Sequence, residues 1–235
     1  MTTQSFSHEE EARLAAQALL KADLKLAAAQ PILFLSSGGS CLHLLEGLDA
    51  SDFSLHHLTL GILDERITTD LTSRNLERLL LTDFFKQATA GGCSVLDWRQ
   101  AIDEPLEQQA QRFETALRTW INQHTNGQII ATLGLGADGH TAGVLPLSED
   151  RVLFSSLFDG SAWVAGYDAK IKSPFPYRVT VTLSFLREHV THAILFVTGK
   201  EKRAALDALL APEGALETTP GRIIQNMKDV KLVHT

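Results

Sequence analysis

Cysteine is scarce in this chain of 235 residues, which contains only Cys41 and Cys93. Two cysteines are too few for the disulfide framework of a small secreted domain, and their spacing matches no metal site. We therefore expect a reducing compartment and interpret both residues as small buried hydrophobes.

Long apolar runs are also missing. Arg13, Lys21, Asp23 and Lys25 interrupt the alanine-rich N-terminal stretch, and no run approaches the length that crosses a bilayer. A secretory signal needs an uninterrupted apolar region, and none is recognisable. The sequence predicts a cytoplasmic protein with no membrane partner.

Positive charge is in short supply. The chain has 21 Lys and Arg against 28 Asp and Glu, a formal net charge of −7. Nonspecific nucleic-acid binding depends on a basic face, so we expect no nucleic-acid partner. An anionic small molecule remains a possible ligand if lysine and arginine side chains converge locally. Composition carries no information on the oligomeric state.

Several catalytic motifs are absent. His43, His56 and His57 have no second ligand at a metal-binding spacing such as H-E-x-x-H, so we predict them to be structural or exposed. The chain contains no G-x-S-x-G nucleophile elbow and no P-loop ending in Gly-Lys-Ser/Thr. Neither a metal site nor a serine nucleophile is predicted.

Short apolar segments alternate with helical patterns along the chain. A capping box at Ser7 and Glu10 predicts a helix to about Ala29, ended by Pro31. Further helices are predicted over residues 41–48, 73–85, 104–123 and 200–210, and strands over 32–35, 58–63, 129–133, 179–183 and 193–197. This alternation predicts one α/β domain over residues 1–235, with a doubly wound, mainly parallel sheet flanked by helices.

The most informative segment is the glycine-rich stretch of residues 134–142, Gly-Leu-Gly-Ala-Asp-Gly-His-Thr-Ala. It follows a predicted strand, and ligands of open α/β sheets bind at the carboxyl ends of strands. Asp138 and His140 are a titratable pair at that place, and His140 is the strongest candidate for general acid–base catalysis. The alternative is a tight turn with a buried, hydrogen-bonded histidine.

The same segment matches G-x-G-x-x-G through Gly134, Gly136 and Gly139. A dinucleotide site also needs an acidic residue about 20 positions further on, at the end of the next strand. Asp159 has the right distance, but residues 151–160 do not read as a strand, and Asp138 would place a negative charge beside the pyrophosphate. We therefore reject the dinucleotide interpretation.

Three other places could contribute to a site. Residues 36–40, Ser-Ser-Gly-Gly-Ser, lie between a strand and a helix, where backbone N–H groups favour an anion or Ser40 acts as a simple cap. Asp64-Glu65-Arg66 ends a strand, and Arg66 could bind a phosphate or carboxylate or form only a surface ion pair. Arg178 opens a strand, and Lys202 lies in a first helical turn, where a bound anion would offset its unfavourable position. Each of these cations could equally be ordinary surface charge.

Taken together, six segments resemble the 6-phosphogluconolactonase family, within the wider group that includes glucosamine-6-phosphate deaminase. They follow the family's order over about residues 32–210. The segments are Leu35-Ser36-Ser37-Gly38-Gly39-Ser40, Leu63-Asp64-Glu65-Arg66, Ser73-Arg74-Asn75, residues 133–146, residues 177–183 and Thr198-Gly199-Lys200-Glu201-Lys202.

The resemblance implies a Rossmann-like fold of the glucosamine-6-phosphate deaminase type. It also implies hydrolysis of 6-phospho-D-glucono-1,5-lactone to 6-phosphogluconate, in the oxidative pentose phosphate pathway, with a sugar phosphate as partner and no metal or organic cofactor. The residues that it implies for catalysis are His140 as base, Asp138 to orient it or its water, and Arg66. Those implied for substrate and phosphate binding are Ser37, Gly38, Gly39, Ser40, Asp64, Gly136, Gly139, Thr141, Arg178 and Lys202.

The implied chemistry agrees with the residue types. A lactone carbonyl needs an activated water, a base that works near neutral pH, and donors for the developing oxyanion. An imidazole suits the first task. Either the glycine-loop N–H groups or Arg66 could supply the donors.

Several positions depart from the family pattern. Cys41 replaces a common Thr, Arg74 interrupts the usual Ser-Asn pair, and Gly143 replaces the Ser of Gly-His-Thr-Ala-Ser. Thr68-Thr69 stands where Val-Pro is usual, and residues 229–235 lack the common Trp-Asp-Ala ending.

Two other functions compete with lactone hydrolysis. A glucosamine-6-phosphate deaminase or isomerase usually has Asp-Glu-Tyr and Gly-His-Ile-Ala-Phe-Asn-Glu-Pro, and this chain has neither. A non-catalytic sugar-phosphate-binding module is the second alternative, since fold does not fix function.

Overall fold

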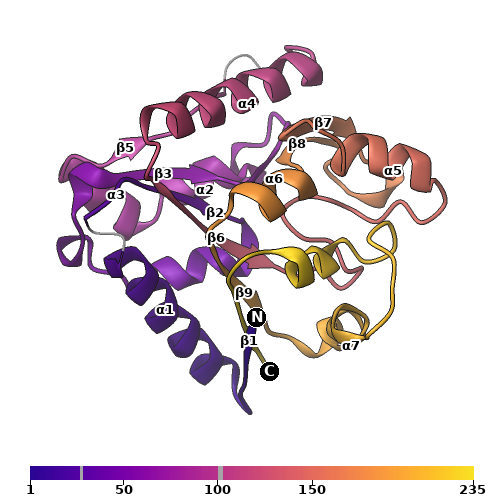
Figure 1. Ribbon diagram of the computed structural model, residues 1–235, viewed down its shortest axis with the longest axis horizontal. Coiled ribbons are helices and arrows are strands. Elements are labelled where there is room, and N and C mark those ends of the chain that lie inside the picture. Colours follow the sequence, from indigo (N-terminus) through magenta and orange to yellow (C-terminus); the bar gives the residue numbers. More distant parts are fainter. Residues whose placement is uncertain (27–28, 100–102) are drawn as a thin grey trace.

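The computed structural model describes residues 1–26, 29–99 and 103–235 and is built around a seven-stranded parallel sheet (Figure 1). Its central strands are largely apolar and buried over almost their whole length, as expected where helices cover both faces. In spatial order the strands are β1 (Thr2–Ser5), β10 (Val230–His234), β9 (His192–Val197), β6 (Gln128–Gly134), β2 (Ile32–Ser36), β3 (Leu58–Ile62) and β5 (Ser94–Val95). Every pairing in this sheet is parallel, which confirms the predicted fold class.

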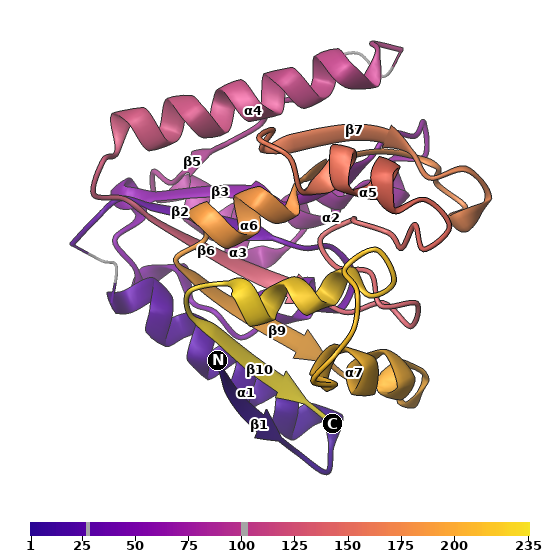
Figure 2. The same ribbon diagram turned by 45° about the vertical axis from the view of Figure 1, so that its right-hand side comes forward.

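Helices lie on both faces of this sheet (Figure 2). One face carries α1 (Glu9–Leu26), the 3-10 helix η1 (Gly39–Leu45), α2 (Asn75–Leu80) and α3 (Asp83–Ala90). The other carries α4 (Leu106–Gln123) and α6 (Leu183–His189), and α5 (Arg151–Phe158) and α7 (Arg203–Leu210) follow the loops at the strand ends. The chain runs from β2 to β3 and β5 on one side, then returns to β6, β9 and β10 on the other, so its direction switches between β2 and β6.

A second sheet of three antiparallel strands was not predicted. It has the order β4 (Asp64–Arg66), β8 (Tyr177–Val181) and β7 (Val164–Asp168), and α4 packs against it. Leu63 joins the two sheets, because its N–H donates to Ser36 O and its carbonyl accepts from Val181 N. Residues 64–66 are thus a strand in their own right.

Other elements differ from prediction at their boundaries. The predicted helix over 73–85 is two helices, because α2 ends at Leu80 and a new helix begins after Thr82. The hydroxyl of Thr82 caps α3 by accepting a hydrogen bond from Phe85 N at 3.3 Å. Where a helix over 41–48 was predicted, the chain forms the 3-10 helix η1, which begins and ends earlier. Residues 200–202 form a 3-10 turn, η6 (Lys200–Lys202), before α7. The first helix begins at Glu9 and is described to Leu26; residues 27–28 lie outside the described residues, and Ala29, the predicted end, lies in a turn.

The core confirms the apolar patterning. Ala12, Ala16, Leu20 and Leu24 recur every four residues on α1 and are buried against the sheet. Both cysteines are buried and free, as expected. Within the described ranges, no helix is both long and apolar enough to span a membrane.

One ion pair inside this packing is predicted to matter for stability. Asp23 on α1 is 2 % exposed, and its carboxylate is paired with Lys231 Nζ on β10. Lys231→Ala would leave that carboxylate buried without its partner, and we expect a loss of about 3 kcal/mol in the free energy of unfolding. Lys21→Ala removes a more exposed lysine of α1 from its pair with Asp52, which lies in the 3-10 helix Ala50–Asp52, and should cost much less. Denaturant titration of both variants checks the contrast, and equal losses would contradict it.

Candidate active site

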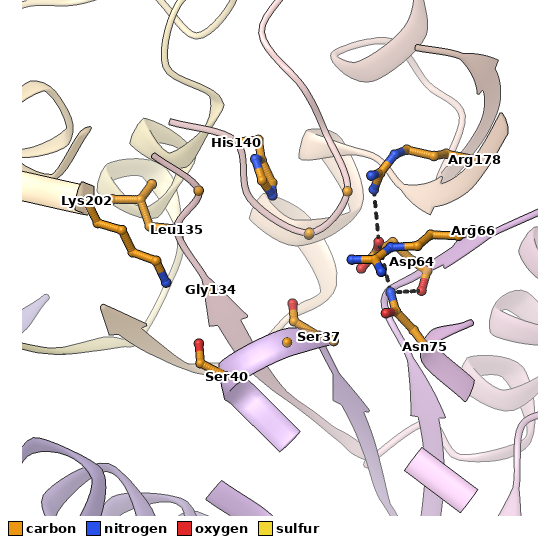
Figure 3. Close-up of a pocket in the computed structure, with 15 residues that line it drawn as sticks. Ser37, Ser40, Asp64, Arg66, Asn75, Gly134, Leu135, His140, Arg178 and Lys202 are labelled. Atoms are coloured by element: carbon orange, nitrogen blue, oxygen red, sulfur yellow. Dashed lines mark hydrogen bonds and ion pairs between the residues drawn. The ribbon is translucent and has the colours of Figure 1, made fainter. Parts of the chain in front are cut away.

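Four neighbouring parallel strands end at one pocket. The turn at residues 36–40 follows β2, Asp64 follows β3, the glycine-rich loop follows β6, and residues 198–202 follow β9. The first and third of these loops leave the sheet on the two sides of the switch between β2 and β6, which is where open α/β sheets bind ligands. The sequence placed each loop at a strand end, and the fold brings them together (Figure 3).

His140 and Asp138 form a hydrogen-bonded pair at the tip of the glycine-rich loop. Asp138 Oδ1 lies 2.6 Å from His140 Nδ1 and also accepts from His140 N at 3.1 Å. Burial raises the pKa of Asp138, but its hydrogen bond to His140 and the charge of His140 outweigh burial and lower the pKa below its ordinary value. Asp138 is therefore ionised at neutral pH and accepts a hydrogen bond from Nδ1–H, which leaves Nε2 as the ring nitrogen with a lone pair.

Gly136 makes room for this pair. A Cβ at this position would lie 2.0 Å from His140 Nδ1 and 2.5 Å from Asp138 Oδ1. The loop is closed by two backbone hydrogen bonds, from Gly136 N to His140 O and from Gly139 N to Gly136 O, both 2.9 Å long. No side chain fits at residue 136 while the pair keeps its place.

Gly136→Ala is accordingly expected to lower turnover by about 100-fold, because displacing a catalytic group by an ångström costs about that much. The matched control is Gly160→Ala, whose added Cβ would meet only Ser156 O at 3.6 Å. Steady-state rates and melting temperatures of the two variants decide the matter. Full activity in Gly136→Ala would show that the pair has no role in turnover.

Two side-chain hydrogen bonds to backbone carbonyls fix the segment after His140. Thr141 is buried and its hydroxyl donates to Gly134 O at 2.8 Å, while Tyr167 Oη donates to Gly143 O at 2.6 Å. Gly143 has a φ of +74°, and a Cβ there would lie 2.6 Å from Asp64 Cβ. The replacement of the usual serine by Gly143 thus lets the loop approach Asp64 closely.

The turn after β2 presents polar groups to the pocket. Ser37 and Ser40 line the pocket together with Gly38 and Gly39, and Ser37 N donates to Thr132 O at 3.0 Å. Ser37 is buried, and its Oγ has no hydrogen-bond partner among the described residues. The first N–H groups of η1 also lack intrahelical partners, as at any helix start.

Lys202 reaches the same turn from the other direction. Figure 3 shows its amine extending toward Ser40, on the opposite side of His140 from the two arginines. Within the part of the chain that the structure describes, Lys202 has no ion pair. Cys41 lies behind this turn, and burial raises the pKa of its thiol to about 12, with Lys202 acting in the opposite direction. The thiol is neutral at physiological pH and is no candidate nucleophile.

Arg66 and Arg178 form the other wall of the pocket. They are cross-strand partners in the pairing of β4 with β8, and the carboxylate of Asp64 lies 3.6 Å from Arg178 Nη1. Arg66 Nη1 donates to Ser73 O at 3.2 Å. Burial lowers the pKa of Arg66, and Asp64 opposes that shift. Two guanidinium groups are thus held side by side against one carboxylate.

Sequence reasoning missed Asn75 and Glu65. Asn75 Nδ2 donates to Asp64 O at 2.9 Å and to Asp64 Oδ2 at 3.1 Å, so it fixes the carboxylate that faces Arg178. Glu65 is 1 % exposed and accepts from the backbone N–H groups of Arg66, Asn75 and Leu76. Burial raises the pKa of Glu65 while these donors oppose the shift. The segment Ser73-Arg74-Asn75, which resembles the family pattern, is the sequence signal for Asn75.

The pocket encloses about 240 Å³, at or below the lower end of the range for small-ligand sites and too small for a dinucleotide. Among the described residues its lining includes Arg66, Arg178 and Lys202 but only one carboxylate, Asp64, so the local charge is positive on a chain of net charge −7. Ten of the thirteen predicted site residues line it; Asp138, Gly139 and Thr141 lie behind the lining and shape the loop. The residues described after the glycine loop form no helix before Arg151, which agrees with rejecting a dinucleotide fingerprint.

Buried polar atoms without partners gather here. Among the described residues, six such side-chain atoms occur, and four belong to the pocket: Ser37 Oγ, Arg66 Nε, Asn75 Oδ1 and Arg178 Nε. Such atoms cost free energy unless a ligand or water satisfies them. No group of three or more His, Cys, Asp or Glu within these ranges is arranged to hold a metal ion.

Comparison with known proteins gives a consistent result. The family model for glucosamine-6-phosphate isomerases/6-phosphogluconolactonase matches residues 7–233. The 6-phosphogluconolactonase of Neisseria meningitidis serogroup A is 26% identical over 200 residues, covering 85% of this chain and 81% of the relative. That of Helicobacter pylori is 26% identical over 193 residues, covering 82% and 78%.

Solved structures share the fold. The 6-phosphogluconolactonase from Leishmania guyanensis superposes with a TM-score of 0.79 at 20% identity, covering 99% of this chain and 95% of that one. The one from Shewanella baltica gives a TM-score of 0.79 at 20% identity and covers 100% and 98%. At these identities the likeness concerns the arrangement of the chain.

Proposed function

The chain belongs to the family of glucosamine-6-phosphate isomerases and 6-phosphogluconolactonases, and we propose that it is a 6-phosphogluconolactonase, a hydrolase of the pentose phosphate pathway. The observation that carries the proposal is the pairing of His140 with ionised Asp138 in a pocket that is otherwise cationic. A base beside bound water and cations beside a sugar phosphate are what lactone hydrolysis needs.

His140 acts on the water. With Nδ1 bonded to Asp138, its Nε2 accepts a proton from a water molecule as that water attacks the lactone carbonyl. Asp138 holds the ring in this tautomer and stabilises the imidazolium that forms, as the carboxylate does in other histidine–carboxylate pairs. The bond between the former carbonyl carbon and the ring oxygen then breaks, and the proton passes from His140 to that leaving oxygen.

The wall of Arg66 and Arg178 provides the positive charge for the developing oxyanion. Among the described residues, Arg66 Nε is buried without a hydrogen-bond partner, and Nη1 donates one hydrogen bond, to Ser73 O. The guanidinium therefore retains N–H donors for a substrate oxygen. Asp64 and Asn75 hold Arg178 in register beside it. Donors that are fixed before the charge develops stabilise a transition state most effectively.

The phosphate is anchored on the far side of His140, between Lys202 and the turn of Ser37, Gly38, Gly39 and Ser40. Ser37 Oγ has no partner, and Lys202 has no competing carboxylate within the described residues. Gripping the phosphate away from the carbonyl turns binding energy into orientation of the reacting group. In Figure 3, Lys202 and Ser40 lie on one side of His140, where the phosphate is held, and Arg66 and Arg178 lie on the other, where the oxyanion forms.

A substrate panel tests the reaction class. We expect accelerated opening of 6-phosphogluconolactone generated in situ, little acceleration of unphosphorylated gluconolactone, and no ammonia from glucosamine 6-phosphate. Ammonia release would replace lactonase by deaminase. Thermal stabilisation by 6-phosphogluconate without any turnover would indicate a binding module instead.

A further inference from the structure

Arg66 and Arg178 contact a short segment that has no role in the proposed mechanism. Ser173-Pro174-Phe175-Pro176, here called the strap, follows the 3-10 turn Lys170–Lys172 after β7 and leads into β8. It lies outside the set of residues that line the pocket. Its contacts nevertheless converge on the guanidinium groups.

The first contact is made by Ser173. Its Oγ accepts a hydrogen bond from Arg178 Nη2 at 3.0 Å and another from Phe175 N at 3.1 Å. A hydroxyl oxygen has two acceptor sites, and these two donors use both. Arg178 is thereby tied to the backbone of the strap.

The second contact is made by Phe175. Its ring centroid lies 5.4 Å from Arg66 Cζ, with the guanidinium over the ring face, within the range of a cation–π interaction. Since Arg66 and Arg178 are cross-strand neighbours and repel one another, an aromatic face on one and a hydroxyl on the other favour their close approach.

The strap is also stiff. Each proline fixes its own φ and restricts the residue before it to extended backbone, and Ser173 has φ −146° and ψ 142°. Ala169 N donates to Pro176 O at 2.8 Å, which closes the loop at its base. Ile67 N donates to Tyr177 O at 2.9 Å, which fastens the strap's end to the residue after Arg66.

We propose that Ser173 and Phe175 are positioning residues that aim Arg178 and Arg66 at the anionic oxygen formed on the substrate carbonyl. This rests on the proposed lactonase function for the identity of that oxygen. Neither residue touches the substrate. Each acts through one guanidinium and leaves its Nε, which has no hydrogen-bond partner among the described residues, free for the substrate.

The test compares Phe175→Leu with Phe175→Tyr, and Ser173→Ala with Ser173→Thr. Losing the aromatic face should lower kcat/KM for 6-phosphogluconolactone about fivefold, mainly through kcat, and tyrosine should restore it, because a cation–π contact of this kind is worth about that factor. Losing the hydroxyl should cost about as much, and threonine should restore it. Tyr177→Leu, an exposed neighbour of the strap, is the matched control and should stay within about twofold, as exposed side chains usually do.

A double variant separates positioning from a general structural role. In an Arg66→Met background there is no cation for the ring to orient, so Phe175→Leu should cost less than about twofold. An undiminished loss there, or wild-type kinetics in both Phe175→Leu and Ser173→Ala, would overturn the proposal. Wild-type protein without lactonase activity would instead overturn the proposed function. In that case the affinity of each Phe175 and Ser173 variant for 6-phosphogluconate, measured by calorimetry relative to wild type, would test the positioning role of the strap.

Discussion

His140→Ala is expected to lower kcat for 6-phosphogluconolactone about 10³-fold, because it removes the one imidazole that lines the pocket in the described part of the chain and can take a proton from water. The side chain is 39% exposed and makes its hydrogen bond with Asp138, so its loss should leave the fold intact. Steady-state kinetics with spontaneous opening subtracted provides the measurement.

The protein contains its own control for this variant. His192 forms a comparable pair with Asp229, with Nδ1 2.9 Å from Oδ2, at the start of β9 and outside the pocket. His192→Ala should keep wild-type kcat. Equal losses in the two variants would mean that the effect of His140→Ala reports on folding and not on catalysis.

Lys202→Ala is expected to raise KM by about 50-fold while kcat stays within about threefold, since a charge-assisted bond to a phosphate is worth about 2 to 3 kcal/mol. Lys202 lies on the far side of His140 from the arginine wall, so removing it weakens the grip on the phosphate without moving the base (Figure 3).

Lys200→Ala is the matched control, because Lys200 belongs to the same 3-10 turn but is exposed and does not line the pocket. Its KM should stay near that of wild type. A fall in kcat with unchanged KM in Lys202→Ala would move this lysine from phosphate binding to the chemical step.

Much of the fold could be read from periodicity. The strands that carry the site, β2, β3, β6 and β9, are short apolar runs, and the prediction placed all of them within a residue or two of their observed bounds. Because parallel strands end at one edge of a sheet, the prediction that their loops carry the site rested on the placement of those loops at strand ends and on the family resemblance. The loops do meet at one pocket.

The second sheet could not be foreseen in this way. Its strand β4 has only three residues, all charged, and β7 mixes glycine and aspartate into a short run, so neither has the period of a strand. Pairing across a gap of more than a hundred residues makes Arg66 and Arg178 neighbours. The sequence therefore named both arginines but not their wall, nor the strap behind it.

Edge strands were missed for a related reason. β1 is Thr-Thr-Gln-Ser with every residue exposed, and β5 has two residues. Neither buries an apolar face, so their strand character comes from pairing with β10 and β3. The departures at Cys41 and Gly143 proved compatible with the pocket, since the thiol is buried behind the turn and Gly143 fits against Asp64.

The most direct test of the account is the initial rate of 6-phosphogluconolactone loss, with spontaneous opening subtracted, for wild type and His140→Ala at equal protein concentration. Wild type should accelerate the loss strongly, and the variant should give a rate near background. Acceleration that survives in His140→Ala would contradict the role of His140, and no acceleration by wild type would contradict lactone hydrolysis itself.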